Sequence, residues 1–121
     1  MAKKGLLLCV CQGTCPSFQK MDIFEVLNAI RRENLVDYVG IHPQLCATDG
    51  DSFLQVLLHN QDTDMLYVAG CDPTMQTKMF RDALDAASFD RSRHKGVDIR
   101  NMDTAQAIQV IKDMVAADAG V

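Results

Sequence analysis

The chain has 121 residues, 48% of them hydrophobic and 23% charged, which is the composition of an ordinary globular protein. This length fits one domain over residues 1–121 and is sufficient to bury a core. The net charge is −4, the sequence pI is about 5.1, and no basic face is apparent. We therefore expect no nucleic acid partner.

The amino-terminal apolar run, Gly5 to Val10, is shorter than the roughly 7–15 residues of a signal-peptide hydrophobic region. No segment approaches the roughly 20 apolar residues of a membrane span. We therefore expect a cytoplasmic protein without a membrane span. Thiols stay reduced in that compartment, so a group of cysteines is expected to bind metal or to act in redox chemistry rather than to form disulfides.

Four short segments have the pattern of β-strands. The first is a continuous apolar run that ends at Gln12-Gly13, which is typical of a buried parallel strand. The second alternates in hydropathy and stops at His42-Pro43, the third contains Met-Leu-Tyr-Val-Ala, and the fourth is short enough to be an edge strand. The predicted strands cover residues 4–11, 35–41, 64–70 and 95–100.

Each predicted strand is followed by apolar residues at helical spacing. Asp22, Asp72 and Asp103-Thr104 are expected at helix starts, and residues 48–51 offer capping oxygens for the second helix. Residues 88–96 are predicted to form a loop. The helical positions expected to face the core are Ile23, Val26, Leu27 and Ile30, then Phe53, Leu54, Val56, Leu57 and Leu58, then Met75, Met79, Phe80 and Leu84, and finally Ala107, Ile108, Ile111, Met114 and Val115.

Strict alternation of strands and helices predicts the α/β class. The expected architecture is a three-layer, doubly wound, mostly parallel four-stranded sheet of the Rossmann or flavodoxin type. Binding sites in such sheets lie beyond the carboxyl ends of the strands, near the point where the strand order reverses.

Four of the five cysteines fall where a predicted strand gives way to a loop. Cys9 and Cys11 end the first strand, Cys46 follows the second, and Cys71 follows the third. The fifth, Cys15, comes shortly after the first strand. Because the carboxyl ends of parallel strands meet at one edge of the sheet, these thiols are expected to lie close together, which points to a metal or redox centre.

Spacing alone leaves several kinds of site open. A free cysteine is often just a small buried hydrophobe, and Cys9 within its leucine run fits that description. Zinc usually takes paired ligands two to four residues apart, a poor match here, although His42 lies four residues before Cys46. A dithiol redox site needs Cys-x-x-Cys, which the chain lacks. An iron–sulfur cluster takes four thiolates with less regular spacing, so iron–sulfur and thiol chemistry both remain.

The first loop gives a weaker signal for an anion site. Residues 12–17 contain one Gly, one Thr and one Ser, which could cradle a phosphate, but both G-x-G-x-x-G and the Walker pattern are missing. Three acids, Asp49, Asp51 and Asp72, are expected near the same edge. We interpret them as helix caps rather than as an acidic pocket.

Four motifs carry a resemblance to a known family. They are Cys-Val-Cys-Gln-Gly after the first strand, Leu-Cys-Ala-Thr-Asp-Gly before the second helix, Leu-Tyr-Val-Ala-Gly-Cys-Asp-Pro-Thr, and Val-Asp-Ile-Arg ending at Arg100. Over about residues 5–102 the chain resembles the N-terminal domain of the A subunit of heterodisulfide reductase. It is less similar to the small iron–sulfur subunit of methyl-viologen-reducing hydrogenase, which shares the cysteine before helix two and the Gly-Cys-x-Pro turn.

The resemblance implies an electron-transfer module of an oxidoreductase complex in anaerobic metabolism, not catalytic alone. It implies one iron–sulfur cluster of the [4Fe-4S] type held by Cys9, Cys11, Cys46 and Cys71. Cys15 has no counterpart in the family, but it is the alternative to Cys9, which lies inside the apolar strand. The implied partners are redox proteins of the flavin or ferredoxin type. No flavin is expected on this chain, because the residues that bind it in the family are absent.

The chain departs from the family pattern at two places: Gln12 interrupts the family's Cys-Gly pair, and Asp72 stands where the family has Ser. Two alternatives from other classes therefore remain. One is a metal-free scaffold that docks a partner. The other is a thiol or persulfide carrier that uses Cys11 and Cys15.

Overall fold

The computed structural model describes residues 3–10, 16–45, 47–60 and 63–119. In these residues four strands form one sheet with the order β2-β1-β3-β4, and every neighbouring pair is parallel. The strands are β1 (Lys4–Cys9), β2 (Tyr38–His42), β3 (Met65–Gly70) and β4 (His94–Asp98). The helices are α1 (Ile23–Arg32), α2 (Thr48–Asn60), α3 (Pro73–Ala86) and α4 (Thr104–Ala119), with short 3-10 turns η2 (Pro16–Phe18) and η3 (Arg91–Arg93).

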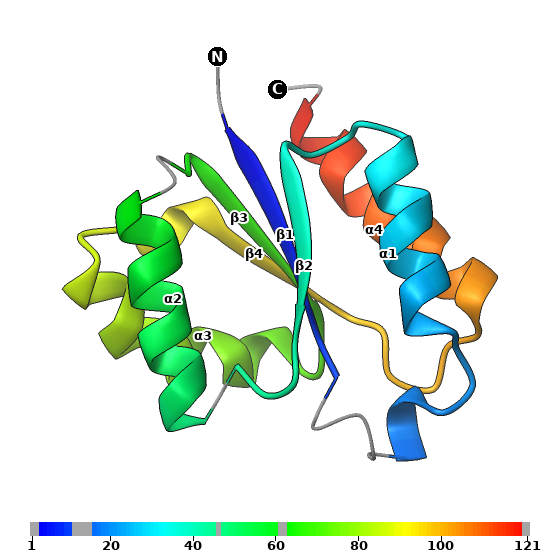
Figure 1. Ribbon diagram of the computed structural model, residues 1–121, viewed down its shortest axis with the longest axis horizontal. Coiled ribbons are helices and arrows are strands. Elements are labelled where there is room, and N and C mark those ends of the chain that lie inside the picture. Colours follow the sequence, from blue (N-terminus) through cyan, green and yellow to red (C-terminus); the bar gives the residue numbers. More distant parts are fainter. Residues whose placement is uncertain (1–2, 11–15, 46, 61–62, 120–121) are drawn as a thin grey trace.

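The elements form three layers. Helices α1 and α4 cover one face of the sheet, and α2 and α3 cover the other (Figure 1). The chain moves from β1 to β2 in one direction and then returns past β1 to β3 and β4, so the sheet is doubly wound. The α/β class, the alternation and the architecture predicted from the sequence are confirmed. No helix of the described segments is long and apolar enough to cross a membrane.

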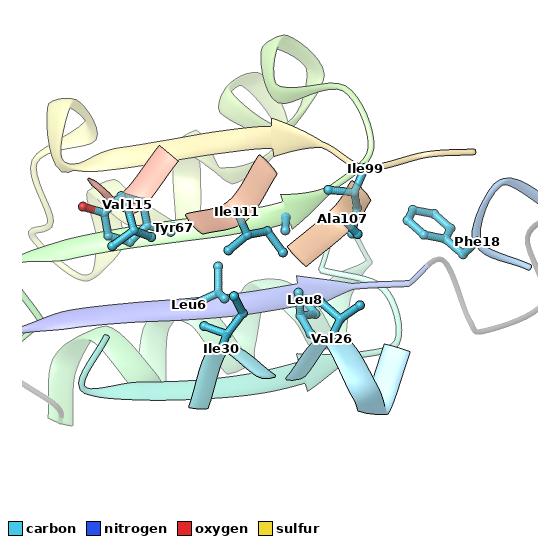
Figure 2. Close-up of a cluster of buried hydrophobic side chains, with 11 residues drawn as sticks. Leu6, Leu8, Phe18, Val26, Ile30, Tyr67, Ile99, Ala107, Ile111 and Val115 are labelled. Carbon is cyan, nitrogen blue, oxygen red and sulfur yellow. The ribbon is translucent and has the colours of Figure 1, made fainter. Parts of the chain in front are cut away.

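Side chains of β1 alternate between the two faces of the sheet. Leu6 and Leu8 point toward α1 and α4, where they pack with Tyr67 of β3 (Figure 2). Leu7 and Cys9 belong to the second core, beneath α2 and α3. The buried residues of the first core are Leu6, Leu8, Phe18, Val26, Ile30, Tyr67, Ala69, Ile99, Ala107, Ile111 and Val115, and those of the second are Leu7, Cys9, Leu45, Leu54, Leu58, Leu66, Val68, Phe80, Ala83, Leu84 and Phe89.

The helix starts predicted at Asp22, Asp72 and Asp103-Thr104 are confirmed, and an aspartate caps each of these helices. The carboxylate of Asp22 accepts the N–H groups of Phe24 and Glu25 at 3.1 and 3.2 Å, and that of Asp72 accepts the Thr74 N–H at 2.9 Å. Asp103 and Gln106 exchange side-chain and backbone hydrogen bonds in a capping box. The prediction for residues 48–51 is wrong, because α2 already begins at Thr48 and these residues form its first turn.

The predicted buried face of α3 is wrong at two methionines. Met75 and Met79 are 44% and 47% exposed. The buried positions are Gln76, Phe80, Ala83 and Leu84, which recur at the 3.6-residue period of a helix. Gln76 and Phe80 each come one residue after an exposed methionine. In α2 the prediction fails in the same way at Val56, which is 61% exposed while Leu54 and Leu58 are buried.

The loop predicted for residues 88–96 is shorter than expected. The turn η3 lies inside it, and β4 begins at His94, which pairs with Leu66 of β3. His94 is 9% exposed and packs edge-on against Phe80, with ring centroids 5.6 Å apart. Because His94 is buried and already pairs with β3, β4 begins inside the segment that was predicted to be a loop.

Candidate metal centre

Strands β1 and β3 end side by side at the switch point of the sheet. Leu8 pairs with Ala69, Cys9 is the last residue of β1, and Cys71 immediately follows β3. The lower ends of both strands in Figure 1 mark this edge. It is the position at which doubly wound sheets place their binding sites.

Cys9 lies inside the protein at this edge. Cys9 is 4% exposed and belongs to the core beneath α2 and α3. The backbone N–H of Leu45 donates to Cys9 Sγ at 3.3 Å. The segment that leads from β2 into α2 therefore lies over the end of β1 and presents a donor to the sulfur.

Cys71 is more accessible than Cys9. It is half-buried and immediately precedes Asp72, the N-cap of α3. The side-chain amide of Gln76, one turn into the helix, donates from Nε2 to Cys71 Sγ at 3.9 Å. Cys71 thus resembles Cys9 in having an N–H group directed at its sulfur.

A cation lies near Cys71. Arg100 donates to both carboxylate oxygens of Asp98, with the shortest distance 2.7 Å from Nη2 to Oδ2. These hydrogen bonds raise the pKa of the Arg100 guanidinium above its ordinary value, and the proximity of Cys71 and Asp72 raises it further. The same contact lowers the pKa of Asp98. Arg100 therefore stays charged near the Cys71 sulfur.

Gly70 occupies a tightly packed position between Cys9 and the Gln76 amide. A Cβ at this position would lie 3.0 Å from the carbonyl oxygen of Cys9, 3.0 Å from Gln76 Nε2 and 3.1 Å from the Cys9 Cβ. These separations are shorter than ordinary van der Waals contacts. A side chain at position 70 would therefore require the Cys9 backbone or the Gln76 amide to shift by a few tenths of an ångström.

We expect Gly70→Ala to lower the free energy of unfolding by about 1–3 kcal/mol, because the added methyl group overpacks the edge of the second core. Chemical denaturation of the metal-free protein measures this loss. The matched control is Gly40→Ala in β2, whose Cβ would meet only Leu7 Cδ2 at 3.7 Å. Equal stability of the two variants would contradict the tight packing at Gly70.

The structure describes two of the predicted cysteine ligands. Cys9 and Cys71 come to the same edge, whereas Cys11, Cys15 and Cys46 lie outside the described residues. Within the described ranges, no three side chains of His, Cys, Asp and Glu converge as a metal site would require. The chain thus places two sulfurs at the switch point, and the remaining predicted ligands stay predictions.

His42 is engaged with the protein rather than directed at an open site. Its Nδ1 accepts the backbone N–H of Gln44 at 3.0 Å, and its Nε2 lies 3.7 Å from the Asp49 carboxylate. The ring also lies against Phe53, with centroids 5.1 Å apart. Asp49 therefore contacts His42 from the first turn of α2 instead of capping the helix as predicted.

Sequence reasoning missed two groups at this edge, the Leu45 N–H and the Gln76 amide. The first carries no side-chain signal, because a backbone donor is available at every residue except proline. The second had one: Phe80, Ala83 and Leu84 define a helix face that also contains position 76. A polar residue on that face, close after a cysteine, is the pattern that could have revealed it.

The surroundings of the two sulfurs fit a metal-bound thiolate. Both sulfurs face N–H donors, and Arg100 adds positive charge near one of them. A thiolate bound to a metal is negative and bears no hydrogen, so donors stabilise it where acceptors would not. Hydrogen bonds to sulfur are also a principal means by which proteins adjust iron–sulfur centres.

The fold and this edge together define a doubly wound α/β domain with cysteines at its switch point. No family model matches the chain. The chain is 24% identical over 120 residues to an iron-sulfur subunit of CoB–CoM heterodisulfide reductase from Methanopyrus kandleri. The match covers 93% of this chain but only 18% of that relative, so the similarity is distant and concerns a small part of the larger protein.

Proposed function

We propose that the chain is a single-domain iron–sulfur electron-transfer module of a heterodisulfide-reductase-like complex. In this proposal Cys9, Cys11, Cys46 and Cys71 hold one [4Fe-4S] cluster. The observation that carries it is the placement of Cys9 and Cys71 at the switch point with an N–H donor directed at each sulfur. The distant similarity to a protein named as an iron-sulfur subunit supports the same assignment.

When bound, such a cluster supplies a site that accepts and releases one electron. The chain's own residues would set the conditions for this. Leu45 and Gln76 direct N–H groups at the sulfurs, and Arg100 contributes a nearby positive charge. The second core excludes water from the Cys9 side, while half-buried Cys71 lies on the more open side. The proposed partners are redox proteins of the flavin or ferredoxin type, which would deliver and remove the electron.

A reductive titration tests the proposed function. Protein reconstituted with iron and sulfide without oxygen should take up about one electron per chain from dithionite, with loss of its visible absorption. A metal-loaded protein that takes up no electrons would contradict electron transfer. A metal-free protein that forms a Cys11–Cys15 disulfide on mild oxidation would instead favour a thiol carrier, and one that keeps five free thiols would favour a scaffold.

A further inference from the structure

We infer that Gln76 is a positioning residue that sets the reduction potential of the proposed cluster through the hydrogen bond from its side-chain amide to Cys71 Sγ. This inference rests on the proposed function and names a residue that acts on that site. Gln76 would not bind the metal. It would act through the sulfur of Cys71.

The sheet has room for this amide because two strands carry glycine beneath it. A Cβ on Gly70 of β3 would lie 3.0 Å from Gln76 Nε2, and a Cβ on Gly96 of β4 would lie 3.0 Å from Gln76 Oε1. Each end of the amide therefore rests over a backbone without a side chain. The two glycines together leave room for the amide between α3 and the sheet, where its Nε2 donates to Cys71 Sγ.

The burial of the Gln76 amide by itself lowers the stability of the fold. Gln76 is 2% exposed, and within the described part of the chain its Oε1 has no hydrogen-bond partner. A buried acceptor without a partner costs free energy, whereas an apolar side chain of similar length would fill the same space without that cost. Packing therefore does not account for glutamine here. The contact that distinguishes it from an apolar residue is the N–H directed at Cys71.

Electrostatics gives the direction of the effect. Reduction adds negative charge to a cluster, and part of that charge resides on the ligand sulfurs. A donor to one of those sulfurs stabilises the reduced form more than the oxidised form and so raises the reduction potential. Because the Gln76 amide is buried, solvent screens its dipole only weakly.

The test is the midpoint potential of reconstituted Gln76→Met, which keeps the length of the side chain and removes the donor. We expect this variant to bind as much iron as the wild type. Its midpoint potential should be more negative by about 59 mV, which corresponds to a tenfold change in the reduced-to-oxidised ratio for one electron. The matched control is Gln55→Met on the exposed face of α2, which should leave the potential unchanged.

Thermal unfolding of the metal-free proteins shows whether Gln76 adjusts the reduction potential or instead stabilises the fold. Gln76→Met should melt at or above the wild-type temperature, because it removes an unpaired buried carbonyl. A clearly lower melting temperature, or an unchanged potential at equal iron content, would overturn the inference and leave the proposed function intact. A wild type that takes up no iron would overturn the proposed function, and this inference with it.

Discussion

Cys71→Ala should lose most of its bound iron, falling from about four atoms per chain to less than one after anaerobic reconstitution. The proposal gives Cys71 one of four thiolate positions, and alanine offers no ligand in its place. The side chain is half-buried, so its removal leaves both cores intact. The far-ultraviolet circular dichroism spectrum should therefore match that of the wild type while the visible absorption disappears.

The matched control is Cys15→Ala, which removes a thiol that the proposal leaves outside the primary ligand set. It should retain the iron and sulfide of the wild type. Full iron content in Cys71→Ala would contradict the assignment of Cys71 as a ligand. Equal losses in both variants would contradict the division of the cysteines into four ligands and one bystander.

Acidification from pH 6.5 to pH 4 should destabilise the metal-free protein by about 3 kcal/mol through His94 alone. Burial lowers the pKa of this histidine from 6.5 to about 4. Its Nε2 has no hydrogen-bond partner among the residues that the structure describes. Between the two pKa values the unfolded chain binds a proton that the folded chain does not. The contribution of His94 to stability is therefore complete above about pH 6.5 and decreases as the pH falls toward 4.

His94→Phe should remove most of this pH dependence, because an aromatic ring of similar shape preserves the packing against Phe80 without a titrating group. Urea denaturation at half-unit steps from pH 4 to pH 7 measures the slope. His59→Phe on the exposed surface of α2 is the matched control and should keep the wild-type slope. A wild-type slope in His94→Phe would show that other groups cause the acid sensitivity.

The fold was predictable because short continuous apolar runs alternate along the chain with segments whose apolar residues recur at helical spacing. The apolar run at Leu6–Val10 and the segment at Met65–Gly70 are continuous, as buried parallel strands are, and capping aspartates mark helix starts at Asp22, Asp72 and Asp103. The α3 face was less predictable. Methionine is hydrophobic enough to suggest burial, yet tertiary packing oriented the helix by Phe80 and Leu84 and left Met75 and Met79 exposed.

The candidate site was predictable in position but not in detail. Cysteines at strand ends, together with the parallel topology, place Cys9 and Cys71 at one edge of the sheet, as the structure shows. The donors to their sulfurs come from Leu45 and Gln76. The Leu45 contact carries no side-chain signal, because it depends on how a loop packs over the strand ends. The burial of Gln76 could be inferred from the face of α3, but its contact with Cys71 depends on how that helix packs. The effect of Gly70 is likewise visible only once Cys9 and Gln76 are seen on either side of it.

The content of iron and acid-labile sulfide per chain, in wild-type protein produced and purified without oxygen, tests whether the cysteines hold an iron–sulfur cluster. We expect about four of each, with a broad visible absorption that is lost on reduction. Zinc in place of iron would assign the cysteines to a structural site. Zinc, or the absence of any metal, would contradict an electron-transfer module built on this edge of the sheet.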